Sequence, residues 1–213
     1  MRPAAVIFDC DGVVVDSEPA SFDLLGHDLA EHGLRLSHAE LEANLLGLTM
    51  KNVRLRAIQM GADLAEDWVE KFYAKLYAAL ATGVPLMPGL LAVLDRLDAA
   101  GIPYAMGSNG SLRKMEITLG QHPGLRARFR GIWSGQDMPN PKPYPDLYLH
   151  AAALMGVSAA ECVVVEDSPT GARAAKAAGM RCIGLSAMPN PGLAAAGAQV
   201  VRRLQDLLPL LGL

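Results

Sequence analysis

Short apolar runs that end abruptly at acidic or polar residues recur along this chain. Helical patterns lie between them. The runs span residues 4–8, 103–107, 131–134, 162–166 and 181–185, and the helical patterns span 89–100, 111–119, 145–155 and 170–178. Buried strands that alternate with helices are joined by crossover connections, so the strands run parallel. The sequence therefore predicts an α/β fold built on a doubly wound parallel sheet.

One long segment breaks this alternation. It contains four helical patterns, near residues 19–33, 38–46, 50–60 and 66–81, with glycines at their ends. We expect an α/β core of residues 1–16 and 84–213 and an inserted helical cap at 17–83. Two linkers would join the insert to the core, an arrangement that suits a hinge. Helices packed permanently on the sheet are the alternative.

The composition narrows the classes of partner. The 213 residues are 51% hydrophobic and 19% charged, with a formal net charge of -3 and no basic block, which argues against a nucleic-acid partner. No apolar run approaches the roughly 20 residues that span a bilayer, so no membrane partner is expected. Cys10, Cys162 and Cys182 lack paired spacing and are expected to be reduced thiols. These features predict a cytoplasmic protein, a monomer or weak homodimer, that acts on a small molecule.

Two carboxylates follow the first predicted strand directly. Asp9 and Asp11 would lie at the carboxyl end of that strand, where open parallel sheets bind ligands. One carboxylate can attack phosphorus while the other handles the proton of the leaving group. The same spacing occurs in calcium loops, but valines at 13–15 occupy the positions where further oxygen ligands would be needed.

Glu166 and Asp167 end another predicted strand, at the same edge of the sheet. A solvated turn is the simplest explanation for such a pair. However, clustered carboxylates repel one another unless a cation compensates them. Oxygen ligands with positions left for water and phosphate suit Mg²⁺, so the sequence predicts a magnesium site.

Two further elements complete the candidate site. Ser108 and Asn109 follow a strand and precede a helix, where backbone amides and a hydroxyl can bind an anion, although simple helix capping is the alternative. Lys142 lies in a proline-rich loop that restricts its backbone and suits a residue that must hold a charge in place.

The order of these elements resembles that of the haloacid dehalogenase superfamily of phosphotransferases. The resemblance extends from Val6 to about Gly184 and points to the subgroup with a helical cap after the first motif. That subgroup includes β-phosphoglucomutase and many sugar-phosphate phosphatases. The motifs that carry it are Asp9-Cys10-Asp11-Gly12, Ser108-Asn109-Gly110, Lys142-Pro143 and Glu166-Asp167.

The resemblance implies a role for each residue. Asp9 would be the nucleophile and a magnesium ligand. Asp11 would be the acid and base, and its backbone carbonyl would bind the metal. Lys142 would neutralise developing charge. The other implied roles are phosphoryl binding by Ser108, the amide of Asn109 and Gly110, and metal binding by Asp167 with Glu166 assisting directly or through water.

The cap is expected to select the substrate, through the loop from Gly47 to Lys51. Lys71 and Lys75 are further candidates for a second anionic group. In the mutases of this family a hinge histidine follows the first motif and a cap arginine binds the second phosphate of the substrate, but Ser21 and Met50 occupy those positions here. Their absence favours a phosphatase of small phosphorylated metabolites, similar to the 6-phosphogluconate phosphatase type, over a mutase.

Two other classes of protein fit the sequence less well than a phosphatase. A catalytically inactive binding protein on the same scaffold would have lost the nucleophile, the lysine or the acidic metal ligand, and all three are present here. A dehalogenase would need neither Asp11 nor a magnesium site.

Overall fold

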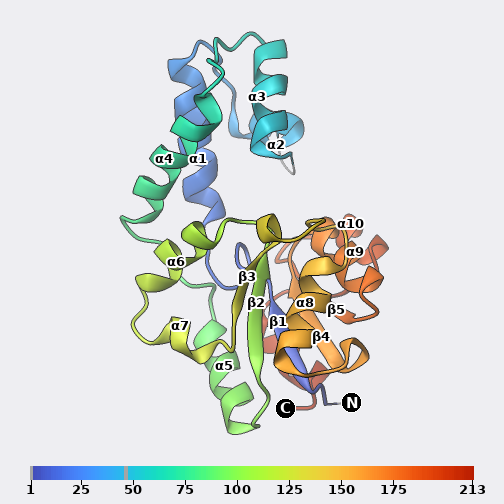
Figure 1. Ribbon diagram of the computed structural model, residues 1–213. Coiled ribbons are helices and arrows are strands. Elements are labelled where there is room, and N and C mark those ends of the chain that lie inside the picture. Colours follow the sequence, from blue (N-terminus) through green and yellow to red (C-terminus); the bar gives the residue numbers. More distant parts are fainter. Residues whose placement is uncertain (1, 46–47) are drawn as a thin grey trace. The chain divides into compact units, whose positions relative to one another are not determined.

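The computed structural model describes residues 2–45 and 48–213, which form two compact units. One unit comprises Met1–Asp16 and Pro85–Leu213, and the other comprises Ser17–Val84. Figure 1 traces the chain through both. Within the described residues, no helix is both long and apolar enough to cross a membrane.

The larger unit contains a six-stranded parallel sheet in the order β3-β2-β1-β4-β5-β6. Its strands are β1 (Ala5–Phe8), β2 (Tyr104–Ser108), β3 (Ile132–Ser134), β4 (Cys162–Glu166), β5 (Arg181–Leu185) and β6 (Gln199–Val201). The predicted doubly wound parallel sheet is confirmed. Strand β6 was not predicted, because the residues of this short edge strand are exposed or half-buried and form no buried apolar run.

Helices cover both faces of this sheet. They are α5 (Leu90–Ala99), α6 (Leu112–Gly120), α7 (Leu125–Arg128), α8 (Asp146–Met155), α9 (Pro169–Ala177), α10 (Pro191–Ala195) and α11 (Leu207–Leu210). Helix α8 contacts β1, β2 and β3, and α9 contacts β4 and β5 (Figure 1). Ile7 packs in the core beneath these two helices, while Phe8 makes edge-to-face contacts with Tyr104 and Phe129. Because both faces of β1 are buried, its carboxyl end is rigidly placed.

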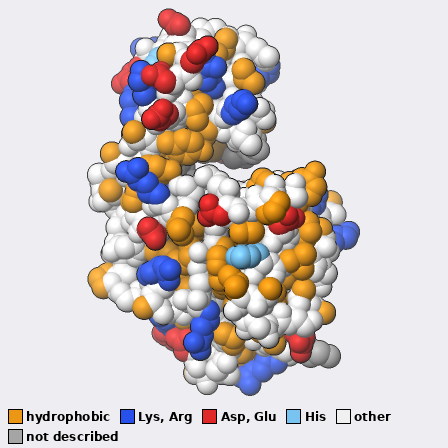
Figure 2. All heavy atoms as spheres, in the orientation of Figure 1, with side chains coloured by type: hydrophobic (Ala, Val, Ile, Leu, Met, Phe, Trp, Pro, Cys, Tyr) orange, Lys and Arg blue, Asp and Glu red, His pale blue; other side chains and the backbone are white. Residues whose placement is uncertain are grey.

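One face of the molecule shows how its surface side chains are distributed. On the face that Figure 2 displays, acidic and basic side chains are interspersed and hydrophobic ones are scattered between them. Cys10, Cys162 and Cys182 are free thiols and buried, as the sequence analysis predicted.

The smaller unit is helical and has its own polar anchor. Its helices are α1 (Glu18–Glu31), α2 (His38–Leu45), α3 (Met50–Gln59) and α4 (Trp68–Leu80). Asp28 on α1 is 3% exposed and accepts hydrogen bonds from Trp68 Nε1 at 2.6 Å and Lys75 Nζ at 2.5 Å. Lys75 also bonds Glu31, so its charge is used within this unit, and Lys71 is likewise paired, with Asp67.

Replacing Asp28 by alanine should destabilise this helical unit. The substitution leaves the buried indole N–H of Trp68 without its carboxylate, and we expect a loss of about 1–3 kcal/mol in unfolding free energy. Urea unfolding followed by tryptophan fluorescence measures it. The control is Glu31→Ala, which removes the exposed partner of the same lysine and should cost less than about 1 kcal/mol. Equal losses in the two variants would contradict the assignment of Asp28 as the anchor.

Candidate active site

The carboxyl ends of three adjacent strands bring the candidate residues together. Asp9 follows β1, Ser108 ends β2 and Glu166 ends β4. The parallel register aligns Phe8 with Met106 on one side and with Val165 on the other. The strand order reverses direction at β1, and this switch point is where open α/β sheets bind ligands.

Lys142 lies at the centre of this group. Its Nζ donates to Asp9 Oδ1 at 2.5 Å, to Glu166 Oε1 at 2.7 Å and to the carbonyl of Gly107 at 2.8 Å. An ammonium group has three donors, so these contacts use all of them. The side chain is only 3% exposed. The sequence placed Lys142 in this site without indicating that it bridges two carboxylates.

Burial and charge oppose each other in this group. Burial raises the pKa of Asp9 to about 7; Lys142 opposes the rise, and the charges of Glu166 and Asp11 add to it. Burial alone would lower the pKa of Lys142, but the two carboxylates keep it above its ordinary value. Burial also disfavours the charged form of Glu166, yet Lys142 outweighs it and lowers the pKa. One lysine facing two buried carboxylates leaves a negative charge that a cation would offset.

Glu166 is enclosed by donors on both sides. Oε1 accepts from Lys142 and from the Tyr148 hydroxyl at 2.8 Å. Oε2 accepts from the backbone amide of Asp167 at 3.1 Å and from both the amide and the hydroxyl of Ser168, at 3.0 and 2.8 Å. A Cβ at Gly171 would collide with this carboxylate, so α9 approaches closely only because that residue is glycine. Glu166 therefore lies behind the site and orients Lys142 and the turn after β4.

Asp167 approaches the turn after β1. Gly12 has a φ of +71°, which side chains rarely adopt, and a Cβ there would collide with the Asp167 carboxylate. The Asp167 carboxylate thus lies against the turn that follows Asp9 and Asp11. Among the described residues no cluster of three His, Cys, Asp or Glu side chains forms a metal site by itself. A set of two carboxylates and a carbonyl, with water and phosphate in the remaining positions, nevertheless suits a hard divalent cation.

The loop after β2 is fastened to its neighbours. Ser108 is 3% exposed, and its Oγ accepts from the amide of Gly110 at 3.0 Å, which leaves the hydroxyl hydrogen to point elsewhere. The side chain of Asn109 donates to the carbonyl of Lys142 at 3.1 Å and accepts from its amide at 3.0 Å. This two-way bond fixes the lysine loop, and the backbone amide of Asn109 is the candidate donor to a ligand.

A second ion pair adjoins the first. Lys114, on α6, donates to Asp11 Oδ1 at 2.8 Å. Burial would lower the pKa of Lys114, but the charge of Asp11 raises it, so the lysine stays a cation. Lys114 was not among the site residues predicted from the sequence. Tyr148 carried no signal at all, because a tyrosine in an apolar helix is usually a core residue.

The structure does not test the two substrate residues predicted in the cap. Lys51 lies in the helical unit, exposed in the first turn of α3. Gly47 lies outside the described residues. Their predicted contacts with substrate stay predictions.

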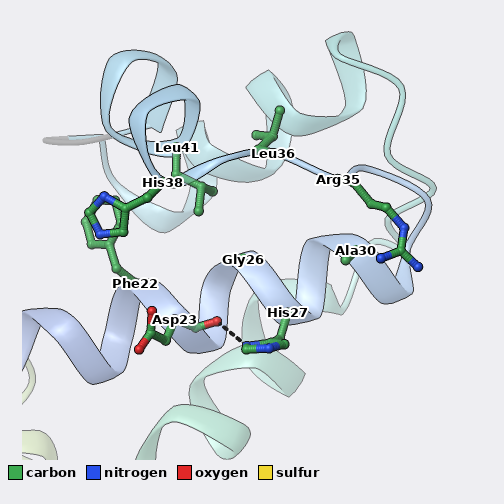
Figure 3. A pocket seen from close by; sticks show the side chains of 9 residues that line it. All are labelled: Phe22, Asp23, Gly26, His27, Ala30, Arg35, Leu36, His38 and Leu41. Atoms are coloured by element: carbon green, nitrogen blue, oxygen red, sulfur yellow. Dashed lines mark hydrogen bonds between the residues drawn. The ribbon is translucent and has the colours of Figure 1, made fainter.

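The helical unit has a hollow of its own, with a volume of about 280 Å³ (Figure 3). The rings of His38 and Phe22 meet there at a tilt, with centroids 5.7 Å apart, and His27 bonds the carbonyl of Asp23 on its own helix. The rest of the lining is Gly26, Ala30, Arg35, Leu36 and Leu41. Its polar side chains are exposed, unlike the buried charges of the sheet edge, which makes the sheet edge the better candidate for catalysis.

Comparisons with known proteins agree with this geometry. A family model described as a haloacid dehalogenase-like hydrolase matches residues 3–179. The chain belongs to the haloacid dehalogenase-like hydrolase family. The family assignment made from the motif order is thereby confirmed, as is the expectation of a hydrolase.

Three relatives place this hydrolase within its family. Hexitol phosphatase A of Escherichia coli is 34% identical, over 88% of this chain and 85% of its own length. A bifunctional riboflavin kinase/FMN phosphatase of Arabidopsis thaliana is 26% identical over 96% of this chain, which spans only 54% of that relative. A family hydrolase of Deinococcus radiodurans, solved with bound phosphate and sodium, is 31% identical with a TM-score of 0.82, covering 98% of this chain and 95% of its own.

Both side-chain oxygens of Glu166 act only as hydrogen-bond acceptors, so Glu166→Gln, which replaces one of them with a donor, should destabilise the hydrolase. The new amide hydrogens would face either Lys142 and Tyr148 or the turn after β4, and the lysine would lose a charge partner. Breaking a buried ion pair costs about 3–5 kcal/mol. Chemical denaturation measures this loss. The same substitution at Glu161, which is exposed, is the control and should change stability by less than about 0.5 kcal/mol. An unchanged midpoint for Glu166→Gln would contradict the assigned position.

Proposed function

We propose that this chain is a magnesium-dependent phosphatase that hydrolyses small phosphorylated metabolites, sugar or sugar-acid phosphates, through an aspartyl-phosphate. One observation carries the proposal: the carboxylate of Asp9 lies at the switch point of the sheet, held by the buried ammonium of Lys142 beside Ser108. A positioned carboxylate next to a fixed cation and an anion-binding loop is what phosphoryl transfer requires.

Each residue then has a task. Asp9 attacks phosphorus, so that the Asp9–phosphorus bond forms as the ester bond breaks. Asp11 gives its proton to the leaving oxygen and later takes a proton from the water that hydrolyses the aspartyl-phosphate, releasing inorganic phosphate. Lys142 compensates the charge on Asp9 and the phosphoryl group. Ser108 and the backbone amides of Asn109 and Gly110 bind the phosphoryl oxygens.

The magnesium ion would be held by the carboxylates of Asp9 and Asp167 and the backbone carbonyl of Asp11. When bound it supplies a template for the phosphoryl group and Lewis-acid stabilisation of its charge. The uncompensated charge around Lys142 supports a cation at this place. Glu166 acts from behind, because both of its oxygens already accept hydrogen bonds within the protein.

The relatives support the substrate class. Hexitol phosphatase A is named for its action on a small phosphorylated sugar alcohol, and it matches this chain over most of both lengths. The Deinococcus radiodurans hydrolase holds a phosphate. Both fit a small phosphate ester as the substrate here.

Hydrolysis is favoured over the mutase reaction. A mutase must return the phosphoryl group to its sugar, and the residues that serve this in the resembling mutases are replaced. Ser21 bonds the carbonyl of Ser17 at 2.8 Å through its hydroxyl, and Met50 is an apolar residue in the first turn of α3. Neither side chain offers a cation for a second phosphate.

Replacing the nucleophile should abolish turnover. Asp9→Asn is expected to lower the hydrolysis of p-nitrophenyl phosphate with Mg²⁺ by more than about 10³-fold, because the amide cannot form the intermediate. A chelator should stop the wild-type reaction, and added Mg²⁺ should restore it. Asp63→Asn, an exposed aspartate in the helical unit, is the control and should keep full activity. Metal-independent turnover or an active Asp9→Asn variant would rule out this mechanism.

A substrate screen should distinguish phosphatase from mutase. With β-glucose 1-phosphate and a catalytic amount of glucose 1,6-bisphosphate, we expect release of inorganic phosphate and little glucose 6-phosphate. A wider screen of two- to six-carbon phosphorylated acids, sugars and sugar alcohols should show higher kcat/KM for some members than for p-nitrophenyl phosphate. Glucose 6-phosphate as the main product would overturn the assignment of hydrolysis.

A further inference from the structure

An ion pair outside the Lys142 network fastens the candidate acid and base to α6. Lys114 Nζ donates to Asp11 Oδ1 at 2.8 Å, and the two side chains are only 15% and 24% exposed. Both residues belong to the α/β unit, so the pair ties the turn after β1 to the first turn of α6. Partial burial reduces screening by solvent and salt, which makes this contact firmer than a surface ion pair.

The backbone that carries Lys114 is itself fixed. Ser111 caps the N-terminus of α6, and its hydroxyl oxygen accepts from the amide of Lys114 at 3.1 Å. One turn further on, the hydroxyl of Thr118 donates to the carbonyl of Lys114 at 3.2 Å. The next residue after Lys114, Met115, is fully buried. The ammonium therefore reaches Asp11 from an anchored position.

The two carboxylate oxygens of Asp11 have different neighbours. A Cβ placed on Gly110 would lie 3.7 Å from Asp11 Oδ2, 3.6 Å from the Cδ of Lys114 and 3.3 Å from the Oγ of Ser108. Oδ2 thus lies near the anion-binding loop. Lys114 bonds the other oxygen, Oδ1, and so contributes to holding the carboxylate in this rotation.

We propose that Lys114 is a positioning residue for Asp11, gripping Oδ1 so that Oδ2 exchanges the proton with the leaving oxygen of the substrate. This inference rests on the proposed phosphatase function and adds a residue to it. In the step concerned, the bond from Asp9 to phosphorus forms, the ester bond breaks, and the proton on Asp11 Oδ2 passes to the leaving oxygen, giving the product alcohol. Lys114 bonds Oδ1 and not the oxygen that carries the proton.

The test uses leaving groups that differ in their need for a proton. Nitrophenolate leaves without protonation, whereas an alkoxide must be protonated as it leaves. The quantity compared is kcat/KM for p-nitrophenyl phosphate and for an alkyl phosphate, either glycerol 3-phosphate or the best alkyl ester from the screen. The value of kcat/KM depends only on the steps up to and including the first irreversible one. Slow hydrolysis of the aspartyl-phosphate therefore does not affect it.

Lys114→Met should lower kcat/KM for the alkyl ester by about 10- to 100-fold, part of the contribution of a general acid, and for the aryl ester by less than about threefold. The loss should lie in kcat rather than KM. Lys114→Arg, which keeps the cation, should retain most of the alkyl activity. Both esters are measured on one preparation, so their ratio does not depend on how much of a variant is folded.

Three further variants make the result decisive. Lys176→Met, at an exposed lysine on α9, should leave both rates unchanged. Asp11→Asn should show the same selectivity for the aryl ester as Lys114→Met, but more strongly. Equal losses for the two esters in Lys114→Met, beside a selective loss in Asp11→Asn, would overturn the role of Lys114 alone. No phosphatase activity in the wild type, or an active Asp9→Asn variant, would overturn the proposed function instead.

Discussion

The bridge from Lys142 to Asp9 and Glu166 is the contact on which the rest of this site depends. A lysine this deeply buried is stable as a cation only because two carboxylates accept from it, and each of them is buried only because the lysine is there. Glu166 fastens the lysine from behind through bonds to Tyr148 and Ser168. Asp9 is the member of the bridge that faces the site, and its charge remains only partly balanced.

Much of this arrangement could be predicted from the sequence, because the strands are short apolar runs and the charged residues follow them directly. Once the strands are parallel, Asp9, Ser108 and Glu166 must meet at one edge of the sheet. The contacts between side chains could not be predicted. Nothing in the order of residues indicates that the side chain of Asn109 turns to the backbone of Lys142, or that Tyr148 reaches Glu166. These depend on how helices pack on the sheet.

The limits of the prediction have a common physical cause. Edge strand β6 was not predicted because its residues are partly exposed and do not form a buried apolar run. In the sequence Lys75 was a candidate for binding an anionic group of the substrate. In the structure it pairs with Asp28, which lies 47 residues away on another helix. Periodicity reports which face of an element is buried. It does not report which distant residue is the partner, so charged residues are assigned correctly only where strand ends bring them together.

The two acidic pairs differ in what surrounds them, and this difference separates support from chemistry. Glu166 is fully buried and both of its oxygens accept hydrogen bonds within the protein, so its neighbours fix its orientation. Asp9 accepts from Lys142 through Oδ1, and Asp11 accepts from Lys114 through Oδ1. A lysine that bonds one oxygen orients the carboxylate and directs the other oxygen elsewhere. In this site the same device therefore aligns the candidate nucleophile and the candidate acid, from two different elements of the fold.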